Sequence, residues 1–364
     1  MKKRAAAASN VKAKGGSRLR VAIAGGSGYG GAESLRWLDG HPCFEVCAVT
    51  SRSSAGKSVA DVHPHLMGFH PALRFVAEPA DALAADPDIF ILALPHRESA
   101  AWARKLLVAK PTLKIVDLSG DHRLGDGESY RAAYGVQHPH ADELTSGRWA
   151  YGLPEANRAQ IRASALVANP GCFATGALLA TLPLAKAGMV KGAVRHVAIT
   201  GSSGSGIEPS AGTHHPERTE NVRAYKVLDH QHVPEITRCL TDHGMKQKTP
   251  WLMVPQSGPF ARGIFTTVFA TLSRALTTED LRGVFLAAYE SHPFVRVRAD
   301  TPQLSHVRGT NFCDIAVKST GTECVVMTAI DNLGKGMVTQ AIQNLNLMCG
   351  LDEPTGLSRP GGRP

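Results

Sequence analysis

The sequence predicts an α/β fold made of two domains, and two observations carry this prediction. Up to Val167, short apolar runs alternate with amphipathic segments, which is typical of parallel strands joined by helices. After Val167 the apolar runs become rich in β-branched and aromatic residues, which favours an α+β domain built on a sheet. A chain of 364 residues is long enough for two domains with cores of ordinary size.

The first element is a buried strand at 19–24, followed by a glycine-rich turn and an amphipathic helix at 32–38. The turn fits the pattern G-x-G-x-x-G, and it has the required strand before it and helix after it. Such glycines permit a tight turn, and N–H groups at the helix N-terminus can bind a pyrophosphate. We therefore predict a Rossmann-type nucleotide-binding domain. Its cofactor-binding residues include Gly26, Ser27, Gly28, Tyr29, Gly30 and Gly31.

The second strand, at 44–50, distinguishes between two dinucleotides. A site for NAD usually places Asp or Glu near the end of this strand, where it binds the ribose 2′-hydroxyl. This chain has Ser51, Arg52 and Ser53 there instead. Hydroxyls around a guanidinium suit a 2′-phosphate, and no acidic group is expected to repel it, so we predict NADP(H). The alternative interpretation is an exposed turn with an incidental arginine.

Two more apolar runs, at 88–95 and 113–119, are typical of parallel strands covered on both faces, with a crossover helix at 99–109 between them. Ligands of open α/β sheets lie beyond the carboxyl ends of the strands. Polar residues at these ends are therefore candidates for the wall of a site. They are His96, Ser119, Asp121 and Arg123.

The strongest chemical signal surrounds Cys172. Pro170 and Gly171 end a short extended run, and the periodicity then becomes helical, so Cys172 is expected in the first turn of a helix. Unpaired N–H groups and the helix dipole stabilise a thiolate there, so we expect a pKa lowered toward neutral pH. The same N–H groups suit an oxyanion. A free cysteine is usually a small buried hydrophobe, but the turn before Cys172 favours a nucleophile.

In the second half, strands are expected at 194–200, 263–271 and 324–330, and a final helix at about 337–349. The loop at 201–206, between the first two of these strands, is rich in glycine and serine and suits close contact with a small ligand.

A cysteine nucleophile needs a proton partner, and histidines gather just before Glu235. If a helix begins near Pro234, Glu235 lies in its first turn and can orient an imidazole, as the third member of a catalytic triad does. An acid/base role ranks first, with His230 ahead of His232, and a satisfied structural histidine ranks second. We predict no metal site, because a third ligand at a recognisable spacing is missing.

Composition limits the partners of the chain. Seven of the nine net positive charges lie in the first twenty residues, so the rest of the chain carries only +2. The basic tail at 1–17 is predicted to be disordered, and it lacks the apolar core of a secretory signal. Neither a nucleic-acid partner nor a membrane span is expected.

Seven cysteines without CxxC pairs favour a reducing compartment, and we expect a cytoplasmic protein.

Six motifs, in this order, resemble the N-acetyl-gamma-glutamyl-phosphate reductase family of arginine biosynthesis, from about Leu19 to Leu357. They are Gly-Ser-Gly-Tyr-Gly-Gly-Ala-Glu at 26–33, Val-Asp-Leu-Ser-Gly-Asp-His-Arg-Leu at 116–124, Tyr-Gly-Leu-Pro-Glu at 151–155, Asn-Pro-Gly-Cys at 169–172, His-x-His-x-Pro-Glu at 230–235 and Asp-Asn-Leu-x-Lys-Gly at 331–336. The resemblance implies a nucleotide domain over 18–168 and a glyceraldehyde-3-phosphate-dehydrogenase-like catalytic and oligomerisation domain over 169–334. It also implies that a C-terminal helix, 335–352, packs back on the first domain.

The resemblance further implies NADPH-dependent reduction of N-acetyl-gamma-glutamyl phosphate, with release of phosphate, through a thioester on Cys172. We expect a homo-oligomer, either a dimer or a tetramer. By similarity Asn332 joins the cofactor site, and Arg123 anchors a phosphate or carboxylate. The other substrate-binding residues implied are Ser202, Ser203, Gly204 and His232.

The chain departs from the family's Asn-Pro-Gly-Cys-Tyr-Pro-Thr at Phe173 and Ala174, while the cysteine and its turn are intact. Residues 213–218 resemble, at least as well, the relatives that reduce aminoadipyl phosphate held on an acidic carrier protein. The alternative function is therefore the same reductive dephosphorylation of a carrier-bound aminoadipyl or glutamyl phosphate. A basic docking face would favour it, but most of the basic charge lies in the tail. Two further alternatives are a nucleotide-binding module without catalysis and a nucleic-acid-binding role that rests on the basic tail.

Overall fold

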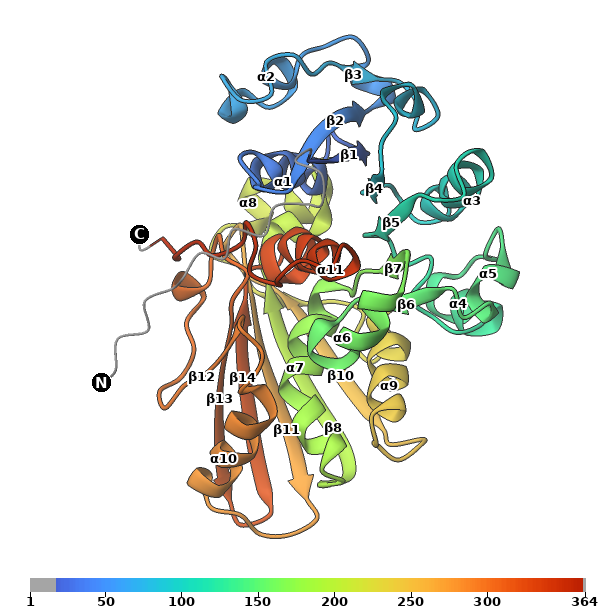
Figure 1. The fold of residues 1–364 in the computed structure, drawn as a ribbon. Coiled ribbons are helices and arrows are strands. Elements are labelled where there is room, and N and C mark those ends of the chain that lie inside the picture. Colours follow the sequence, from blue (N-terminus) through green and yellow to red (C-terminus); the bar gives the residue numbers. More distant parts are fainter. Residues whose placement is uncertain (1–17, 363–364) are drawn as a thin grey trace, which may run out of the picture.

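Two seven-stranded sheets form the protein. The computed structural model describes residues 18–362, and the tail predicted at 1–17 lies outside the described residues. Figure 1 shows the first sheet with its helices above and the long strands of the second sheet below. The predicted α/β class with an added α+β domain is confirmed.

Every strand pair of the first sheet is parallel, and the strand order is β3-β2-β1-β4-β5-β7-β6. The strands are β1 (Leu19–Ala24), β2 (Phe44–Thr50), β3 (Phe75–Val76), β4 (Ile89–Leu92), β5 (Lys114–Asp117), β6 (Trp149–Tyr151) and β7 (Leu166–Ala168). The chain winds outward from β1 in both directions, so a ligand crevice is expected beyond the carboxyl ends of β1 and β4.

The helices of this half of the chain are α1 (Tyr29–Leu38), α2 (Val59–Val62), α3 (Glu98–Ala109), α4 (Gly127–Tyr134), α5 (Ala141–Thr145) and α6 (Pro154–Ala163). Asp121, a predicted candidate for the site wall, instead accepts N–H bonds from Arg97 and Ala100 and holds the first turn of α3. Because these N–H groups have no partner inside the helix, a buried carboxylate is well placed to satisfy them.

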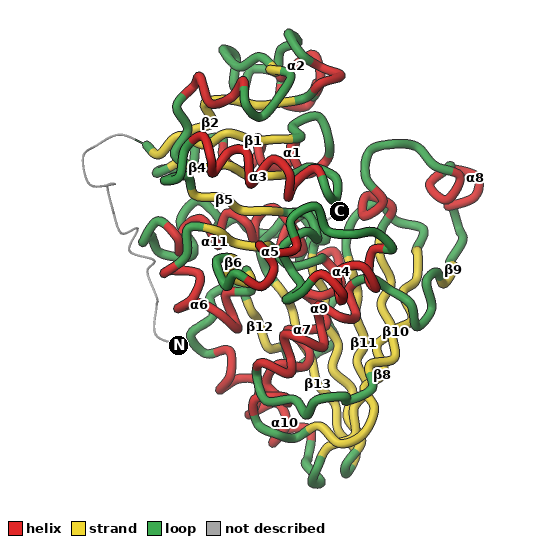
Figure 2. The backbone as a smooth tube through the Cα atoms, turned by 90° about the vertical axis from the view of Figure 1, so that its right-hand side faces the viewer, coloured by secondary structure: helices red, strands yellow, loops and turns green. Residues whose placement is uncertain are grey.

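The second sheet is mixed, in the order β12-β13-β14-β11-β8-β10-β9. Its strands are β8 (Val190–Thr200), β9 (Arg223–Ala224), β10 (Trp251–Ser257), β11 (Ile264–Leu272), β12 (Val295–Val297), β13 (Cys313–Thr320) and β14 (Glu323–Ile330). The helices of this half are α7 (Cys172–Lys186), α8 (His215–Arg218), α9 (His232–Asp242) and α10 (Thr278–Tyr289). Figure 2 shows α7, α9 and α10 on one side of this sheet. Residues 173–185 of α7 are all buried, as its apolar composition predicts.

The chain end returns to the first domain. After β14 come a π-helical turn, η7 (Gly334–Val338), and α11 (Thr339–Met348), so the predicted single helix begins with a wider turn. Every residue of α11 is buried, and the helix packs against α6 and β5. Ile342 and Leu345 share a hydrophobic cluster with Ile23 and Val167 of the first sheet.

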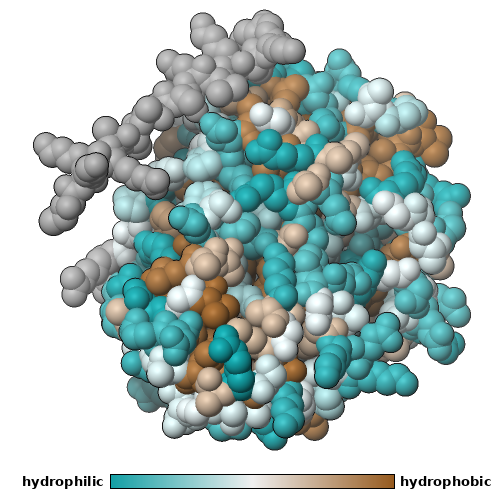
Figure 3. Space-filling view, turned by 60° about the horizontal axis from the view of Figure 1, so that its bottom comes forward, coloured by the Kyte–Doolittle hydropathy of each residue, from teal (hydrophilic) through white to brown (hydrophobic). Residues whose placement is uncertain are grey.

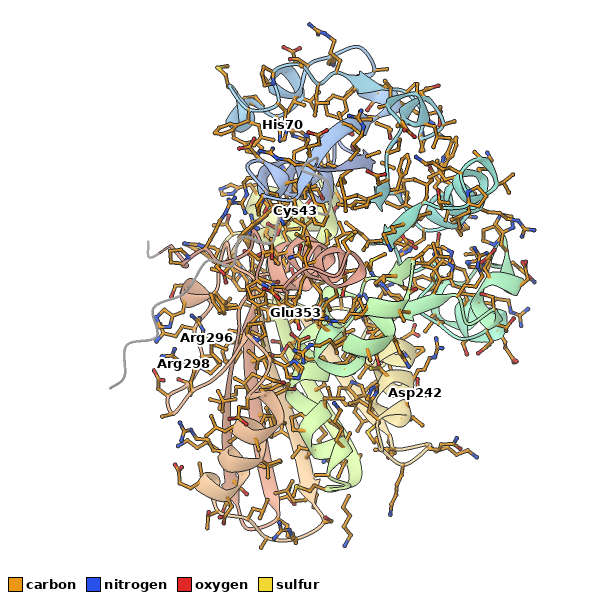
Figure 4. All side chains as sticks on the ribbon, viewed as in Figure 1. Cys43, His70, Asp242, Arg296, Arg298 and Glu353 are labelled. Atoms are coloured by element: carbon orange, nitrogen blue, oxygen red, sulfur yellow. The ribbon has the colours of Figure 1, made fainter. Side chains whose placement is uncertain are left out.

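A buried polar network holds the returning segment in place. Lys335 is fully buried, and its Nζ donates to Glu155 Oε1 and Gln343 Oε1, both at 2.8 Å. Gln343 in turn donates to Glu353, which forms an ion pair with Arg158. Glu353 is labelled in Figure 4 beside α11, at the junction of the two domains. Charged groups without water are stable only when paired in this way.

A second ion-pair cluster ties α1 to the second domain. Arg262, between β10 and β11, binds both carboxylate oxygens of Glu33 at 2.9 and 2.8 Å and the carboxylate of Asp331 at 2.7 Å. Burial alone would raise the pKa of Glu33, but the guanidinium groups of Arg262 and Arg36 outweigh it and hold that pKa at about 2. The helix that follows the glycine turn is therefore fixed against the second domain.

Figure 3, which brings the lower end of Figure 1 forward, shows a face on which apolar residues lie in several separate patches among hydrophilic ones. Within residues 18–362, none of the helices has the length and apolar character needed to span a bilayer.

Candidate active site

The glycine turn leaves one face open beside the N-terminus of α1. A side chain at Gly26 would collide with Val49, and one at Gly31 would collide with the backbone of Gly26. At Gly28, the N-cap of α1, the nearest atom to an added Cβ is Gly25 O at 3.8 Å. The first and third glycines thus let the turn pack, while the second leaves space where unpaired N–H groups can bind a pyrophosphate.

Gly28→Ala is expected to fold normally and to bind dinucleotide at least about tenfold more weakly, because the added methyl group fills the space a pyrophosphate needs. The φ angle of −80° at Gly28 is acceptable for alanine, so backbone strain does not contribute. Thermal denaturation and calorimetric titration would measure the two effects. Gly283→Ala in α10, where an added Cβ meets no atom within 4 Å, is the matched control. Unchanged nucleotide affinity would contradict the assignment of this turn.

A cavity of about 290 Å³ lies beyond β2 and beside the glycine turn. Ser27, Ser51, Arg52 and Ser53 line one part of it, and Ser51 Oγ donates to Ser27 Oγ at 2.9 Å. Apolar side chains, among them Trp102, line another part. The residues present therefore fit an adenosine phosphate, with hydroxyls and a guanidinium for the phosphate and an apolar wall for the base.

The prediction that no acidic group faces this turn is wrong. Glu78, which follows β3, binds Arg52 through two contacts of 2.5 and 3.1 Å, and Glu98 at the start of α3 lies 3.4 Å from it. Both carboxylates come from elements distant in the sequence. Only the parallel pairing of β2 with β3 and the position of α3 bring them to Arg52.

Cys172 begins α7, as predicted, and faces a second cavity of about 370 Å³. Residues of both domains line this cavity, including His96, Leu118, Arg123, Cys172, Gly204, Ser205, Tyr225, His230, His232, Gly336 and Met337. A Cβ at Gly336 would lie 3.0 Å from Cys172 Cβ, so this close approach requires glycine.

The cysteine cavity and the glycine turn share two side chains. A Cβ at Gly30 would lie 3.2 Å from Met337 Sδ and 3.7 Å from Leu118, and both of these side chains also line the cavity around Cys172. Gly336 and Met337 were not among the residues predicted for the site. The only signal for them in the sequence is the glycine that follows the lysine of the Asp-Asn-Leu-x-Lys-Gly motif.

The pKa of Cys172 differs from the expectation. Burial raises it to about 11, although the guanidinium of Arg123 and the N–H of Phe173 favour the thiolate. The prediction of a near-neutral pKa in the ligand-free protein is therefore wrong, because desolvation outweighs the helix N-terminus. The resting group is a protonated thiol.

Alkylation of Cys172 by iodoacetamide is expected to accelerate about tenfold per pH unit between about pH 7 and pH 9, because only the thiolate reacts. Mass spectrometry of the peptide that contains Cys172 would follow the rate site by site. Free cysteine with an ordinary pKa, measured alongside, gives the intrinsic reactivity of an exposed thiol. A rate for Cys172 that levels off below pH 8 would contradict the raised pKa.

Both candidate histidines lie at the cysteine cavity. The ring of His232, the first residue of α9, packs so closely on Gly171 that a side chain there would overlap it. His230 Nδ1 accepts the N–H of His232 at 3.2 Å, and the His230 ring centroid is 5.3 Å from that of Phe173. Burial lowers the pKa of His230 to about 4, so the imidazole is neutral at physiological pH.

Glu235 does not orient His230 as expected. Its Oε1 accepts the N–H of Gly171 at 2.8 Å and the hydroxyl of Tyr151 at 2.7 Å, and its Oε2 lies 3.5 Å from Arg123 Nη1. The buried carboxylate thus fixes the turn that precedes Cys172. Tyr151, which was not among the predicted site residues, completes this arrangement.

Arg123 is buried and links two strand ends. Its Nε donates to Asn169 O and its Nη2 to Leu118 O, both at 2.8 Å. Together with the contact from Nη1 to Glu235, these bonds use one N–H group on each of the three guanidinium nitrogens of Arg123. The guanidinium still lines the cavity. An anchoring role would therefore rest on its remaining N–H groups.

The loop after β8 forms a short 3₁₀ turn at Ser202–Ser205. Asn332 Nδ2 donates to Ser203 Oγ at 3.0 Å, and its Oδ1 accepts the N–H of Gly263 at 2.7 Å. Asn332, expected at the cofactor, thus uses its amide to hold this loop, whereas Gly204 lines the cysteine cavity. Across the described part of the chain, no group of three or more His, Cys, Asp or Glu side chains could hold a metal ion.

Fold and site together define an oxidoreductase of the semialdehyde dehydrogenase class. The family description "Semialdehyde dehydrogenase, NAD binding domain" matches residues 20–164, and "Semialdehyde dehydrogenase, dimerisation domain" matches residues 172–332.

Two solved aspartate semialdehyde dehydrogenases share the fold. The one from Vibrio cholerae, complexed with ASA, has a TM-score of 0.68 at 17% identity and covers 91% of this chain and 98% of its own. The one from Candida albicans, with NADP, has a TM-score of 0.66 at 14% identity and covers 91% of this chain and 99% of its own.

Comparison with curated relatives identifies the family within this class more closely. A protein of Methanoregula boonei is 43% identical over 350 residues, which are 95% of this chain and 100% of the relative. Proteins of Bacillus cereus and Methanocaldococcus jannaschii are each 40% identical, over 93% and 94% of this chain and 98% and 99% of their own lengths. All three are called N-acetyl-gamma-glutamyl-phosphate reductase, and the chain belongs to this family.

Proposed function

We propose that the protein reduces N-acetyl-gamma-glutamyl phosphate to N-acetylglutamate 5-semialdehyde with NADPH, and releases phosphate, in arginine biosynthesis. One observation carries the proposal: Cys172 begins α7 in a cavity that it shares with neutral imidazoles and that adjoins the glycine turn through Leu118 and Met337. The names of relatives about 40% identical over nearly the whole chain support the substrate.

In the first step, the thiol of Cys172 loses its proton to His230, and its sulfur attacks the acyl carbon. The carbon–sulfur bond forms, the carbon–oxygen bond to phosphate breaks, and a thioester remains on the enzyme. N–H groups in the first turn of α7 stabilise the oxyanion that forms during the attack. Glu235 acts as a positioning residue here, because it holds the N–H of Gly171 just before the nucleophile.

Bound NADPH supplies the hydride that reduces the thioester carbonyl. His230 then returns its proton to the resulting oxygen, with His232 as the second candidate. When the thiohemiacetal collapses, its hydroxyl proton passes through the imidazole to the departing sulfur, the carbon–sulfur bond breaks, and the semialdehyde leaves the restored thiol of Cys172. Around the substrate we place Arg123, Ser202, Ser203, Gly204 and His232.

The cofactor site is proposed to consist of residues 26–31 with Ser51, Arg52 and Ser53. The open space at Gly28 supports a pyrophosphate there, and the hydroxyls and guanidinium beyond β2 support the 2′-phosphate of NADP.

We also propose a homo-oligomer, a dimer or a tetramer. The helices of the second domain cover one face of its sheet, and alternate residues on the strands point away from them. Val197, Ile199, Leu252, Phe265 and Phe269 remain partly or fully exposed on that outer face. Apolar residues on an uncovered sheet favour burial against a second copy, and the matched description of this region supports it.

The decisive experiment follows phosphate-dependent reduction of NADP by the purified protein with N-acetylglutamate semialdehyde, which is the reverse direction. Turnover that requires both phosphate and the semialdehyde supports the proposal. Absence of turnover in a folded protein contradicts it. The same assay with the aminoadipyl semialdehyde on its acidic carrier protein would then test the alternative substrate.

A further inference from the structure

The arginine beyond β2 already has a partner in the described structure. Its Nε and Nη2 face both oxygens of Glu78 at 2.5 and 3.1 Å, a bidentate pair. This is the same two-nitrogen edge of a guanidinium that binds two oxygens of a phosphate. Glu98 takes one contact at the Nη1 side.

Strand pairing places Glu78 there. β2 and β3 are parallel, with Thr50 opposite Val76, and Ser51 N–H donates to Val76 O at 2.9 Å. Residues that follow β3 therefore run beside residues that follow β2. Glu78 thus reaches, from β3, the region in which a site for NAD usually has an acidic residue at the end of β2.

We propose that Glu78 is a specificity-determining residue, which sets the preference between NADP and NAD by competing with the 2′-phosphate for Arg52. The proposal rests on the proposed cofactor site. With NADP, the phosphate must displace Glu78 from the guanidinium and leave this carboxylate beside a dianion. With NAD no such exchange occurs, and the Arg52–Glu78 pair persists.

Exposure makes this exchange feasible. The side chain of Arg52 is 61% exposed and that of Glu78 is 34% exposed. Ion pairs this accessible to water contribute little to stability, so a phosphate, which is a stronger partner, can replace the carboxylate. Arg52 also holds the pKa of Glu78 below its ordinary value, so the carboxylate is charged at neutral pH and competes throughout the physiological range.

The test is Glu78→Gln, with dissociation constants for NADP and NAD measured by isothermal titration calorimetry. Removal of the charge is expected to raise the affinity for NADP about fivefold, while the affinity for NAD changes less than about twofold. Glu45→Gln is the matched control, because Glu45 is a similarly exposed glutamate that pairs with Arg20 at the opposite end of β2. It is expected to change neither affinity.

Arg52→Gln separates competition from simple charge repulsion. In that background, Glu78→Gln is expected to raise the NADP affinity less than about twofold, since the shared partner is gone. The proposal is overturned if Glu78→Gln leaves the affinity for NADP unchanged, if it raises both affinities equally, or if its gain persists in full without Arg52. A parent protein that binds neither dinucleotide would instead contradict the proposed function.

Discussion

Cys172→Ser is expected to lower kcat by at least about 10⁴, because a serine hydroxyl is a far weaker nucleophile than a thiolate and the thioester is lost. The fold should survive, since serine is no larger than cysteine and keeps the Cα and Cβ atoms that lie close to Gly336. Dinucleotide affinity should stay within about twofold of the parent. Steady-state kinetics in the reverse direction, with calorimetric titration of the cofactor, would measure both.

The chain offers a close control in Cys349→Ser. Cys349 is also partly buried, and burial raises its pKa to about 11 as well, but it lies at the end of α11 rather than at the start of a helix in the cavity. Its replacement should leave kcat within about twofold. Equal losses from both serine variants would show that the effect of Cys172→Ser is structural.

The second large effect is expected from Lys335→Met. It leaves the buried carboxylate of Glu155 without its cation and should lower the free energy of unfolding by about 3–5 kcal/mol. Urea denaturation would measure the change. Lys318→Met, which removes an exposed lysine from β13, should change the free energy by less than about 0.5 kcal/mol. A loss below 1 kcal/mol for Lys335→Met would contradict the importance of the pair.

The loss of unfolding free energy in Lys335→Met should depend on pH. Burial raises the pKa of Glu155, but Lys335 outweighs it and holds the pKa below 4.5, so the pair stabilises the fold above about pH 4.5 and loses this effect as the carboxylate is protonated. Without Lys335, the largest influence that opposes burial is lost and the pKa of Glu155 rises. The gap between parent and variant should therefore narrow as the pH falls, and Glu155→Gln in the Lys335→Met background should recover part of the stability at pH 7.

The local sequence pattern was sufficient to predict the secondary-structure elements that position the candidate site. A strand, three glycines and a helix predicted the turn at Gly28, and the break before Cys172 predicted the start of α7. Both depend on residues within one or two turns of each other, where hydrogen bonding and steric limits act locally.

Long-range packing decided what the sequence could not show. The pKa of Cys172 depends on what covers it, and Gly336 approaches from the far end of the chain. Likewise, Glu78 reaches Arg52 only through strand pairing, and Glu235 reaches Gly171 only because α9 packs beside α7. A charged residue within a motif can be found in the sequence. The residues that pair with it come from other helices and strands, so the sequence does not show them.

Because α11 returns to the first domain, that domain cannot complete its packing until the end of the chain has been synthesised on the ribosome. The apolar side chains of β5 and α6 that contact α11 have no cover until residues 339–348 have left the exit tunnel. A chain interrupted between Lys186 and Lys335 would carry a complete glycine turn and a complete Cys172 helix, yet would expose this apolar surface and lack the walls supplied by Gly336 and Met337. Incomplete copies should therefore be recognised by chaperones and proteases before they can turn over substrate.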